Sequence, residues 1–253
     1  MSYTVAITGK GGTGKTTIAG LFVTGLVAAG RAPVLAVDAD PNSCLDAVLG
    51  VNAASTVGSV REEARDGSSS GALKGMARAE WIDLRIAESL VEADGFDLIA
   101  MGRPEGPGCY CYANNVLKDV LGRLASNYPY TVIDNEAGLE NLSRRIVRSV
   151  DLLVLAGDPS RRGLETVKRL YGLAVDMKIS YKKLAIIINR LRSDSTPPDL
   201  GSLKSEVPAD FTVFLPDDAE LAELAERGGS MWELSRGNRV AAAVDAFLPE
   251  VFS

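Results

Sequence analysis

Residues 9–17 read Gly9-Lys10-Gly11-Gly12-Thr13-Gly14-Lys15-Thr16-Thr17, and this stretch decides the fold of the chain. It follows an apolar, strand-like run at residues 3–7 and precedes a helical pattern at residues 18–29. Glycines at this spacing let successive backbone N–H groups turn toward a polyphosphate, and the helix that follows presents its positive N-terminal end. Lys15 adds a positive charge and Thr16 adds a magnesium ligand. This context favours a loop that binds a nucleoside triphosphate over a coincidental glycine turn.

Lys10, directly after the first glycine of the loop, narrows the class of protein. A lysine at this place resembles the deviant Walker A group of ATPases, which includes the nitrogenase iron protein, MinD, ParA and the arsenical-pump ATPases. In that group this lysine reaches across a dimer to the phosphates held by the other subunit. The resemblance therefore implies an ATP-controlled homodimer with Lys10 and Lys15 in catalytic positions. The alternative is a solvated loop lysine.

The composition fits one α/β domain. The chain has 253 residues, 46% of them apolar and 6% aromatic, which is enough for one buried core. We expect residues 1–253 to form a single nucleotide-binding domain. The first residues lack the pattern of a secretion signal, and no apolar run approaches the roughly 18 residues that span a bilayer. These features predict a cytoplasmic protein without a membrane partner.

The charge balance excludes some partners and some chemistry. The net charge is −6, with 27 basic residues, 33 acidic residues and no histidine. Such a balance does not encode broad attraction to nucleic acid, so we expect no nucleic-acid partner. Without histidine, the commonest metal ligand and general base is missing. Any soft-metal chemistry must therefore use the three cysteines.

Short apolar runs alternate with helical patterns along the chain. The alternation predicts an α/β fold, with a mainly parallel sheet and helices on both faces, and the resemblance implies a MinD-like P-loop NTPase. The predicted strands are residues 3–7, 33–38, 96–101, 130–134, 152–157, 184–189 and 211–215. The predicted helices include residues 16–29, 115–126, 140–147, 162–176, 218–227 and 239–248. Three stretches are expected to be loops: residues 66–75, 102–112 and 193–199.

Two carboxylates follow the second predicted strand. Asp38 and Asp40 stand two residues apart at a strand end, and ligands of such sheets gather beyond the carboxyl ends of the strands. By resemblance to the deviant group, Asp40 activates the attacking water and Asp38 belongs to the magnesium shell. The alternative is an Asp-Pro-Asn turn with Ser43 as a helix cap, which accounts for the turn but not for both acids.

Two further strand ends carry polar residues that fit a nucleotide site. Asp134 ends the predicted strand 130–134, in the place of the carboxylate that holds a magnesium-bound water. The next residues, 135–138, resemble the second switch of these ATPases. Gly138 can respond there to the γ-phosphate, because glycine reaches backbone conformations that are closed to other residues.

Asn189 ends the buried run 186–189, and asparagine at this place in relatives hydrogen-bonds the adenine ring. Relatives usually have lysine where this chain has Arg190. Pro216 lies in a stretch, 215–218, that could supply a second contact to the base. A plain strand-terminating turn is the alternative, so these base contacts rest on the resemblance.

Cys109 and Cys111 form a Cys-x-Cys pair in a loop rich in glycine and proline. Two thiols supply only half of the four ligands that zinc or nickel takes, and a two-fold dimer would supply four. The alternatives are half-buried small side chains or a redox-labile thiol pair, and compartment and strain disfavour a disulfide. Cys44 is expected to pack as a small apolar residue at a helix start and is not counted as a ligand.

Four motifs together resemble the CooC family, the nickel-insertion ATPases of carbon monoxide dehydrogenase and of acetyl-CoA synthase. They are residues 9–17, 38–45, 108–112 and 132–138. In that family the paired cysteines of two subunits meet at the dimer interface, so the resemblance makes Cys109 and Cys111 ligands of Ni²⁺ or Zn²⁺. It also implies ATP, ADP and Mg²⁺ at the loop and a nickel-free apoenzyme as partner. The chain departs from the pattern at Asn141, where many relatives have histidine.

Two other functions are possible. An electron-transferring reductase like the nitrogenase iron protein needs cysteines on two separate loops, and residues 134–141 contain none. A ParA-like or MinD-like positioning protein uses a basic surface or a basic amphipathic tail, and residues 239–248 contain only one basic residue.

Overall fold

The computed structural model describes residues 2–42, 44–70, 77–102, 122, 124–139, 149–192 and 200–252. The predicted cysteine pair at Cys109 and Cys111, the departure at Asn141 and the predicted helix at residues 140–147 lie outside the described residues. So do most of the predicted helix at residues 115–126, the predicted loop at residues 102–112 after Gly102, and the predicted loop at residues 193–199.

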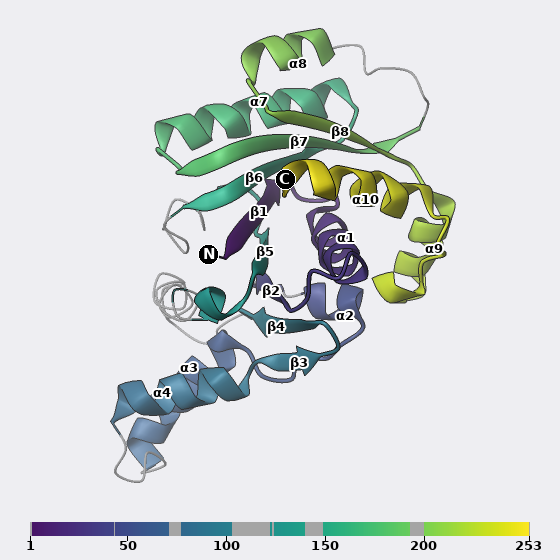
Figure 1. Cartoon of the computed structure of the whole chain (residues 1–253). Helices are drawn as coiled ribbons and strands as arrows, with labels where there is room; N and C mark the ends of the chain where they lie inside the picture. The colour runs from purple at the N-terminus through teal and green to yellow at the C-terminus, as the bar shows by residue number, and fades with distance from the viewer. Residues whose placement is uncertain are drawn as a thin grey trace.

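A single sheet of eight strands runs through the described part of the chain, in the order β3-β4-β2-β5-β1-β6-β7-β8 (Figure 1). Neighbouring strands are parallel except for β3 and β4, so the predicted mainly parallel sheet is confirmed. The strands are β1 (Tyr3–Gly9), β2 (Val34–Ala39), β3 (Val91–Ala93), β4 (Phe96–Ala100), β5 (Tyr130–Asn135), β6 (Val150–Gly157), β7 (Tyr181–Leu191) and β8 (Phe211–Pro216).

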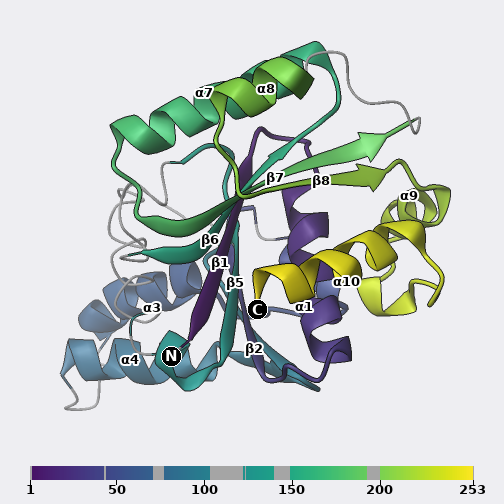
Figure 2. The same cartoon turned by 45° about the horizontal axis from the view of Figure 1, so that its top comes forward.

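Helices cover both faces of the sheet, as predicted. Figure 2 shows α1, α9 and α10 on one side of the sheet and α3, α4, α7 and α8 on the other. Short 3₁₀ turns lie at η1 (Ala125–Asn127) and η2 (Met231–Glu233). The helices are α1 (Lys15–Ala28), α2 (Leu45–Leu49), α3 (Val57–Ser70), α4 (Arg78–Glu88), α7 (Arg161–Asp176), α8 (Leu200–Glu206), α9 (Ala219–Glu226) and α10 (Arg239–Val251).

Alternating side chains of the strands build a separate core on each face. In β1, Val5 and Ile7 pack into the core beneath α1 and α10, whereas Ala6 packs into the core beneath α3 and α7. Strand side chains point alternately to the two faces, and both faces here are covered by helices. The strands of the sheet centre therefore consist of continuous apolar runs such as Ile186-Ile187-Ile188, all 0% exposed.

Two elements differ from the sequence-based expectation. The predicted loop at residues 66–75 is wrong in its first half, because α3 continues to Ser70. A single glycine in a helix, here Gly67, costs only about 1 kcal/mol, which is too little to end it. The edge strand β3 was not predicted, because three residues are too few to show an alternating pattern.

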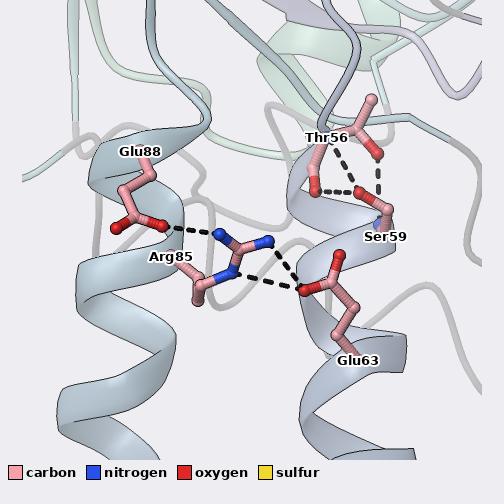
Figure 3. Close-up of polar contacts among 5 residues, drawn as sticks. All are labelled: Thr56, Ser59, Glu63, Arg85 and Glu88. Carbon is pink, nitrogen blue, oxygen red and sulfur yellow. Dashed lines mark hydrogen bonds and ion pairs between the residues drawn. The ribbon is translucent and has the colours of Figure 1, made fainter.

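Polar side chains hold the start of α3 and connect α3 with α4 (Figure 3). Thr56 and Ser59 cap the helix reciprocally, with the Thr56 N–H donating to Ser59 Oγ at 2.9 Å and the Ser59 N–H to Thr56 Oγ1 at 3.1 Å. Further along, the Arg85 guanidinium of α4 bridges Glu88 at 2.6 Å and Glu63 of α3 at 2.9 Å. These partly exposed ion pairs orient the two helices but add little stability.

None of the helices in the described ranges is long and apolar enough to cross a membrane.

Candidate nucleotide-binding site

The polar residues predicted for the site lie together at the carboxyl edge of the sheet. β5 lies between β1 and β2, and its register pairs Asp134 with Ile7 on one side and with Asp38 on the other. The loop after β1 therefore begins beside both carboxylates. β6 separates β1 from β7, yet the side chain of Asn189 still reaches this loop from the end of β7.

The loop at residues 10–14 has the shape of a phosphate cradle. It closes on the Lys10 carbonyl oxygen, which accepts hydrogen bonds from the Thr13 N–H at 3.3 Å and from the Thr13 hydroxyl at 2.8 Å. Gly12 and Gly14 have φ angles of +81° and +88°, which favour glycine. The first turn of α1 follows at once and carries Lys15, which is buried, and then Thr16 and Thr17, which are partly buried.

Lys10 lies on the outer side of the cradle. It is exposed, as are Gly11 and Gly12, whereas Lys15 is only 8% exposed. The two lysines of the motif thus face different surroundings: Lys15 is buried and close enough to Asp134 to lower the pKa of that carboxyl, and Lys10 is exposed to solvent. This is the arrangement that the dimer hypothesis requires of Lys10.

Asn189 and Arg190 hold the loop from the end of β7. The Asn189 amide donates to the Thr13 carbonyl oxygen at 3.0 Å and accepts from the Arg190 N–H at 2.9 Å. The Arg190 guanidinium donates to the Gly12 carbonyl oxygen at 3.2 Å. The structure therefore places both residues against the phosphate loop, a contact that the sequence did not indicate. Their contact with the adenine base stays a prediction.

Arg190 adopts φ +61°, in the left-handed region where a non-glycine residue is strained. We predict that Arg190→Gly relieves this strain and raises the free energy of unfolding by about 0.5–1 kcal/mol. Because the contact with the Gly12 carbonyl is lost, affinity for ATP should fall about three-fold. Denaturant unfolding and nucleotide titration measure the two effects.

Lys178 provides the matched control for Arg190, because it is also left-handed, at φ +53°, and lies between α7 and β7 at the opposite edge of the sheet. Lys178→Gly should raise stability by a similar amount and leave ATP affinity unchanged. Equal ATP affinities in wild type and Arg190→Gly would contradict the bracing role of the guanidinium.

Asp38 holds the residues that follow β2. Its carboxylate is 0% exposed and accepts the backbone N–H groups of Asp40 at 3.1 Å and of Leu45 at 2.9 Å. Burial raises the pKa of Asp38 to about 6, although these backbone donors oppose the shift. Each carboxylate oxygen keeps a second lone pair, so the predicted place of Asp38 in the magnesium shell remains compatible with these bonds.

Asp134 is the residue best placed for magnesium. Burial raises its pKa to about 7, while a hydrogen bond from the Thr16 hydroxyl and the nearby Lys15 charge act in the opposite direction. Its Oδ1 atom is buried and has no hydrogen-bond partner within the described part of the chain. Carboxylate and hydroxyl oxygens are the ligands that Mg²⁺ prefers beside substrate phosphates. Asp134 and Thr16 therefore fit a magnesium ion held against a bound triphosphate.

Asp40 sits in the turn that was the alternative to its catalytic role. Its Oδ1 accepts the backbone N–H of Asn42 at 2.9 Å and the side-chain amide of Asn42 at 3.0 Å. This Asx turn holds the carboxylate beyond the end of β2, where Asp40 is half-buried. The turn and a role in orienting water are compatible, and the latter stays a prediction.

Gly138 lies against the end of β1. Its N–H donates to the Gly9 carbonyl oxygen at 3.2 Å, and its own carbonyl oxygen accepts the buried hydroxyl of Thr8. Asn135 donates its side-chain amide to the Ile7 carbonyl oxygen at 3.1 Å. Sequence reasoning missed Thr8 as a site residue and missed this contact of Asn135, because both contacts depend on strand register and not on a local motif.

Pro216 and Cys44 complete the set of candidate residues. Pro216 ends β8 and pairs with Leu191, two residues beyond Asn189, so it lies near the loop without a contact that assigns it a role. Cys44 directly precedes α2, as expected for a helix start, but the expected packing is wrong because Cys44 is exposed. Its small helix buries Leu45 and Leu49 instead and leaves the preceding thiol outside the core.

The fold and the loop define a nucleotide-binding domain of the P-loop class. The chain belongs to the CobQ/CobB/MinD/ParA nucleotide-binding domain family, whose pattern matches residues 4–231. It is 36% identical over 250 residues to an uncharacterized ATP-binding protein of Methanocaldococcus jannaschii, covering 98% of each chain. It is 32% identical to the carbon monoxide dehydrogenase accessory protein CooC of Rhodospirillum rubrum, covering 91% of this chain and 90% of that one.

Solved structures support the fold assignment. A ParA family ATPase from Chlorobium tepidum superimposes with a TM-score of 0.73 at 18% identity, covering 97% of each chain. At this identity the similarity establishes the shared architecture. The fold is therefore that of the P-loop NTPases of the MinD/ParA type, as expected.

Proposed function

We propose that this protein is a homodimeric, magnesium-dependent ATPase that couples ATP binding and hydrolysis to insertion of nickel into carbon monoxide dehydrogenase or acetyl-CoA synthase. The observation that carries the ATPase is the buried, unpartnered Oδ1 of Asp134 beside the phosphate loop. A buried carboxylate oxygen without a partner costs free energy, and a magnesium ion on a bound triphosphate would be such a partner. The nickel role is supported by the similarity to CooC along 91% of the chain.

The residues of the site divide the work of phosphoryl transfer. Lys15 and the backbone N–H groups of residues 11–16 neutralise and hold the phosphates, while Thr16, Asp134 and Asp38 hold the magnesium ion. Asp40 orients the attacking water from the turn after β2. Magnesium, when held there, would offset the negative charge that develops on the phosphate during transfer. Each of these roles requires positioning and charge, which the site provides without a histidine.

Dimerisation connects the nucleotide to the nickel cargo. Lys10 is exposed beside the phosphate loop, so it could reach a second subunit that faces this edge. In the dimer that the resemblance to the CooC family implies, the Cys109 and Cys111 pairs of both subunits would supply four thiolates, the number that a tetrahedral or square site uses. ATP strengthens the contact between subunits and hydrolysis weakens it, so the nucleotide state controls whether the metal is held or released.

The MinD-like alternative needs an apolar helix face that is free to bind a membrane. In this chain the last helix, α10, buries Val240, Val244, Phe247, Leu248 and Val251 in its own core. The Phe247 ring packs edge-on against Phe22 of α1 and against Phe211 of β8, with ring centroids 6.1 Å and 5.4 Å apart. The apolar face of α10 is thus occupied by the core of this domain and is not free to bind a membrane.

Activation of a nickel-free carbon monoxide dehydrogenase tests the proposed function. With Ni²⁺ and ATP, the wild-type protein should restore enzyme activity, and Lys15→Ala and Cys109→Ser should lose most of this activation. Cys44→Ser is the matched control, because Cys44 is exposed but lies outside the Cys-x-Cys pair, and it should activate normally. Activation that needs neither ATP nor Cys109 would contradict the proposal.

A further inference from the structure

Thr8 is a buried hydroxyl that the magnesium site and the phosphate cradle do not use. It is 0% exposed in β1, one residue before Gly9. Ala6, two residues earlier, packs into the core beneath α3 and α7, and Thr8 points to the same face because strand side chains alternate. There its hydroxyl donates a hydrogen bond to the Gly138 carbonyl oxygen, 130 residues away in the sequence.

Both backbone polar groups of Gly138, the carbonyl oxygen and the N–H, are hydrogen-bonded to residues of β1. Thr8 binds its carbonyl oxygen, and the Gly9 carbonyl oxygen binds its N–H at 3.2 Å. The chain is also anchored before and after Gly138, at Asn135 and at Leu139. Leu139 is 3% exposed in the core beneath α7, and the Asn135 amide donates to the Ile7 carbonyl oxygen at 3.1 Å. Gly138 thus lies between two fixed points, with its own peptide groups bonded to the end of β1.

These contacts determine which groups of Gly138 are available to a nucleotide. Its φ of +95° is open to glycine, and a Cβ built on it would meet nothing within 4 Å, so no neighbouring atom crowds its Cα. Its N–H, however, is already paired with the Gly9 carbonyl oxygen. That N–H can donate to a terminal phosphate only after this bond and the bond from Thr8 are released.

We propose that Thr8 is a positioning residue that holds Gly138 in the resting conformation and so sets how strongly the site distinguishes a nucleoside triphosphate from a diphosphate. This inference rests on the proposed function, because it requires a nucleotide at residues 9–17. A diphosphate leaves the contacts of Gly138 in place, whereas a triphosphate exchanges them for a contact with its terminal phosphate. Since a ligand shifts an equilibrium only by its differential affinity, weakening the resting state favours the triphosphate selectively.

Substitutions of Thr8 distinguish the effect of its hydroxyl group from the effect of its side-chain volume. Thr8→Val keeps the β-branched shape and removes the donor, Thr8→Ser keeps the donor, and Thr8→Ala removes the donor in a smaller side chain. Thr131→Val is the matched control: Thr131 is 1% exposed in the neighbouring strand β5, and its hydroxyl lies 3.4 Å from Ser2 Oγ, away from the site. Calorimetric titration with Mg²⁺ gives the dissociation constants of ADP and of a non-hydrolysable ATP analogue for each variant.

Loss of the Thr8 hydroxyl should raise the preference for the ATP analogue over ADP about five-fold in both Thr8→Val and Thr8→Ala. Thr8→Ser and Thr131→Val should keep the wild-type preference. If the role of Thr8 were purely structural, Thr8→Ser, which also loses a methyl group, would not be expected to differ in this way from the variants that lose the hydroxyl. An unchanged preference in Thr8→Val and Thr8→Ala, with both nucleotides still bound, would overturn the assignment of Thr8 and leave the ATPase intact. A wild-type protein that binds neither nucleotide would overturn the proposed function itself.

Discussion

Gly14→Ala should lower the affinity for ATP about 100-fold, the equivalent of two lost hydrogen bonds to charged phosphates. A Cβ at Gly14 would lie 2.4 Å from the Asn189 amide nitrogen, and the φ of +88° is strained for alanine. The loop or Asn189 must therefore move. Either movement changes the direction of the N–H groups that hold the phosphates. Calorimetric titration with Mg²⁺ and ATP measures the loss.

Alanine substitutions of two other glycines distinguish the steric collision with Asn189 from the backbone strain. Gly12 has φ +81° and Gly228 has φ +68°, and a Cβ on either would meet nothing within 4 Å. Gly228→Ala, between α9 and η2, should cost about 1 kcal/mol of stability and leave ATP affinity unchanged. Gly12→Ala should have an intermediate effect on affinity, because it strains the loop without a collision. Equal affinities in Gly12→Ala and Gly14→Ala would show that Asn189 does not constrain the loop.

Asp134→Asn should stabilise the nucleotide-free protein at pH 8 while abolishing most magnesium-dependent hydrolysis. In the folded chain burial raises the pKa of Asp134 from its ordinary 3.8 to about 7, so the folded state favours the protonated form. Ionisation of Asp134 therefore lowers wild-type stability as the pH rises from about 4 to about 7, and above pH 7 the full penalty applies. A shift of this size corresponds to about 2–4 kcal/mol at pH 8.

The comparison is made by denaturant unfolding of wild type and variant at pH 4 and pH 8, without nucleotide or magnesium. The gain in stability should be present at pH 8 and absent at pH 4, where the wild-type carboxyl is mostly protonated in the fold. Asp210→Asn is the control, because its carboxylate accepts the Leu184 N–H at 2.7 Å away from the site, and it should bring no gain at pH 8. If Asp134→Asn is no more stable than wild type at pH 8, the negative charge of Asp134 does not destabilise the folded protein.

The residues that could be predicted are those whose role follows from local chemistry. The glycine spacing of residues 9–17 indicates a phosphate loop wherever it occurs between a strand and a helix. Asp38 and Asp134 end apolar strand runs, and parallel strands bring such ends to one edge. The structure pairs these two residues directly across β2 and β5, as the α/β pattern suggested.

The residues that could not be predicted depend on which strands become neighbours. Thr8 and Asn135 owe their roles to the pairing of β1 with β5, more than 120 residues apart in the sequence. Asn189 owes its contact with Thr13 to the placement of β7 two strands from β1. No period or motif within either segment carries this information. The exposure of Cys44 could not be predicted for a similar reason, because it depends on how α2 packs after β2.

The account as a whole depends on two chains joining around ATP to make one metal site. Native mass spectrometry of the protein with Mg²⁺, a non-hydrolysable ATP analogue and Ni²⁺ tests this most directly. We predict a dimer with one Ni²⁺ per two chains, and loss of that metal in Cys109→Ser. A monomer with nucleotide bound, or one Ni²⁺ per chain that survives Cys109→Ser, would contradict it.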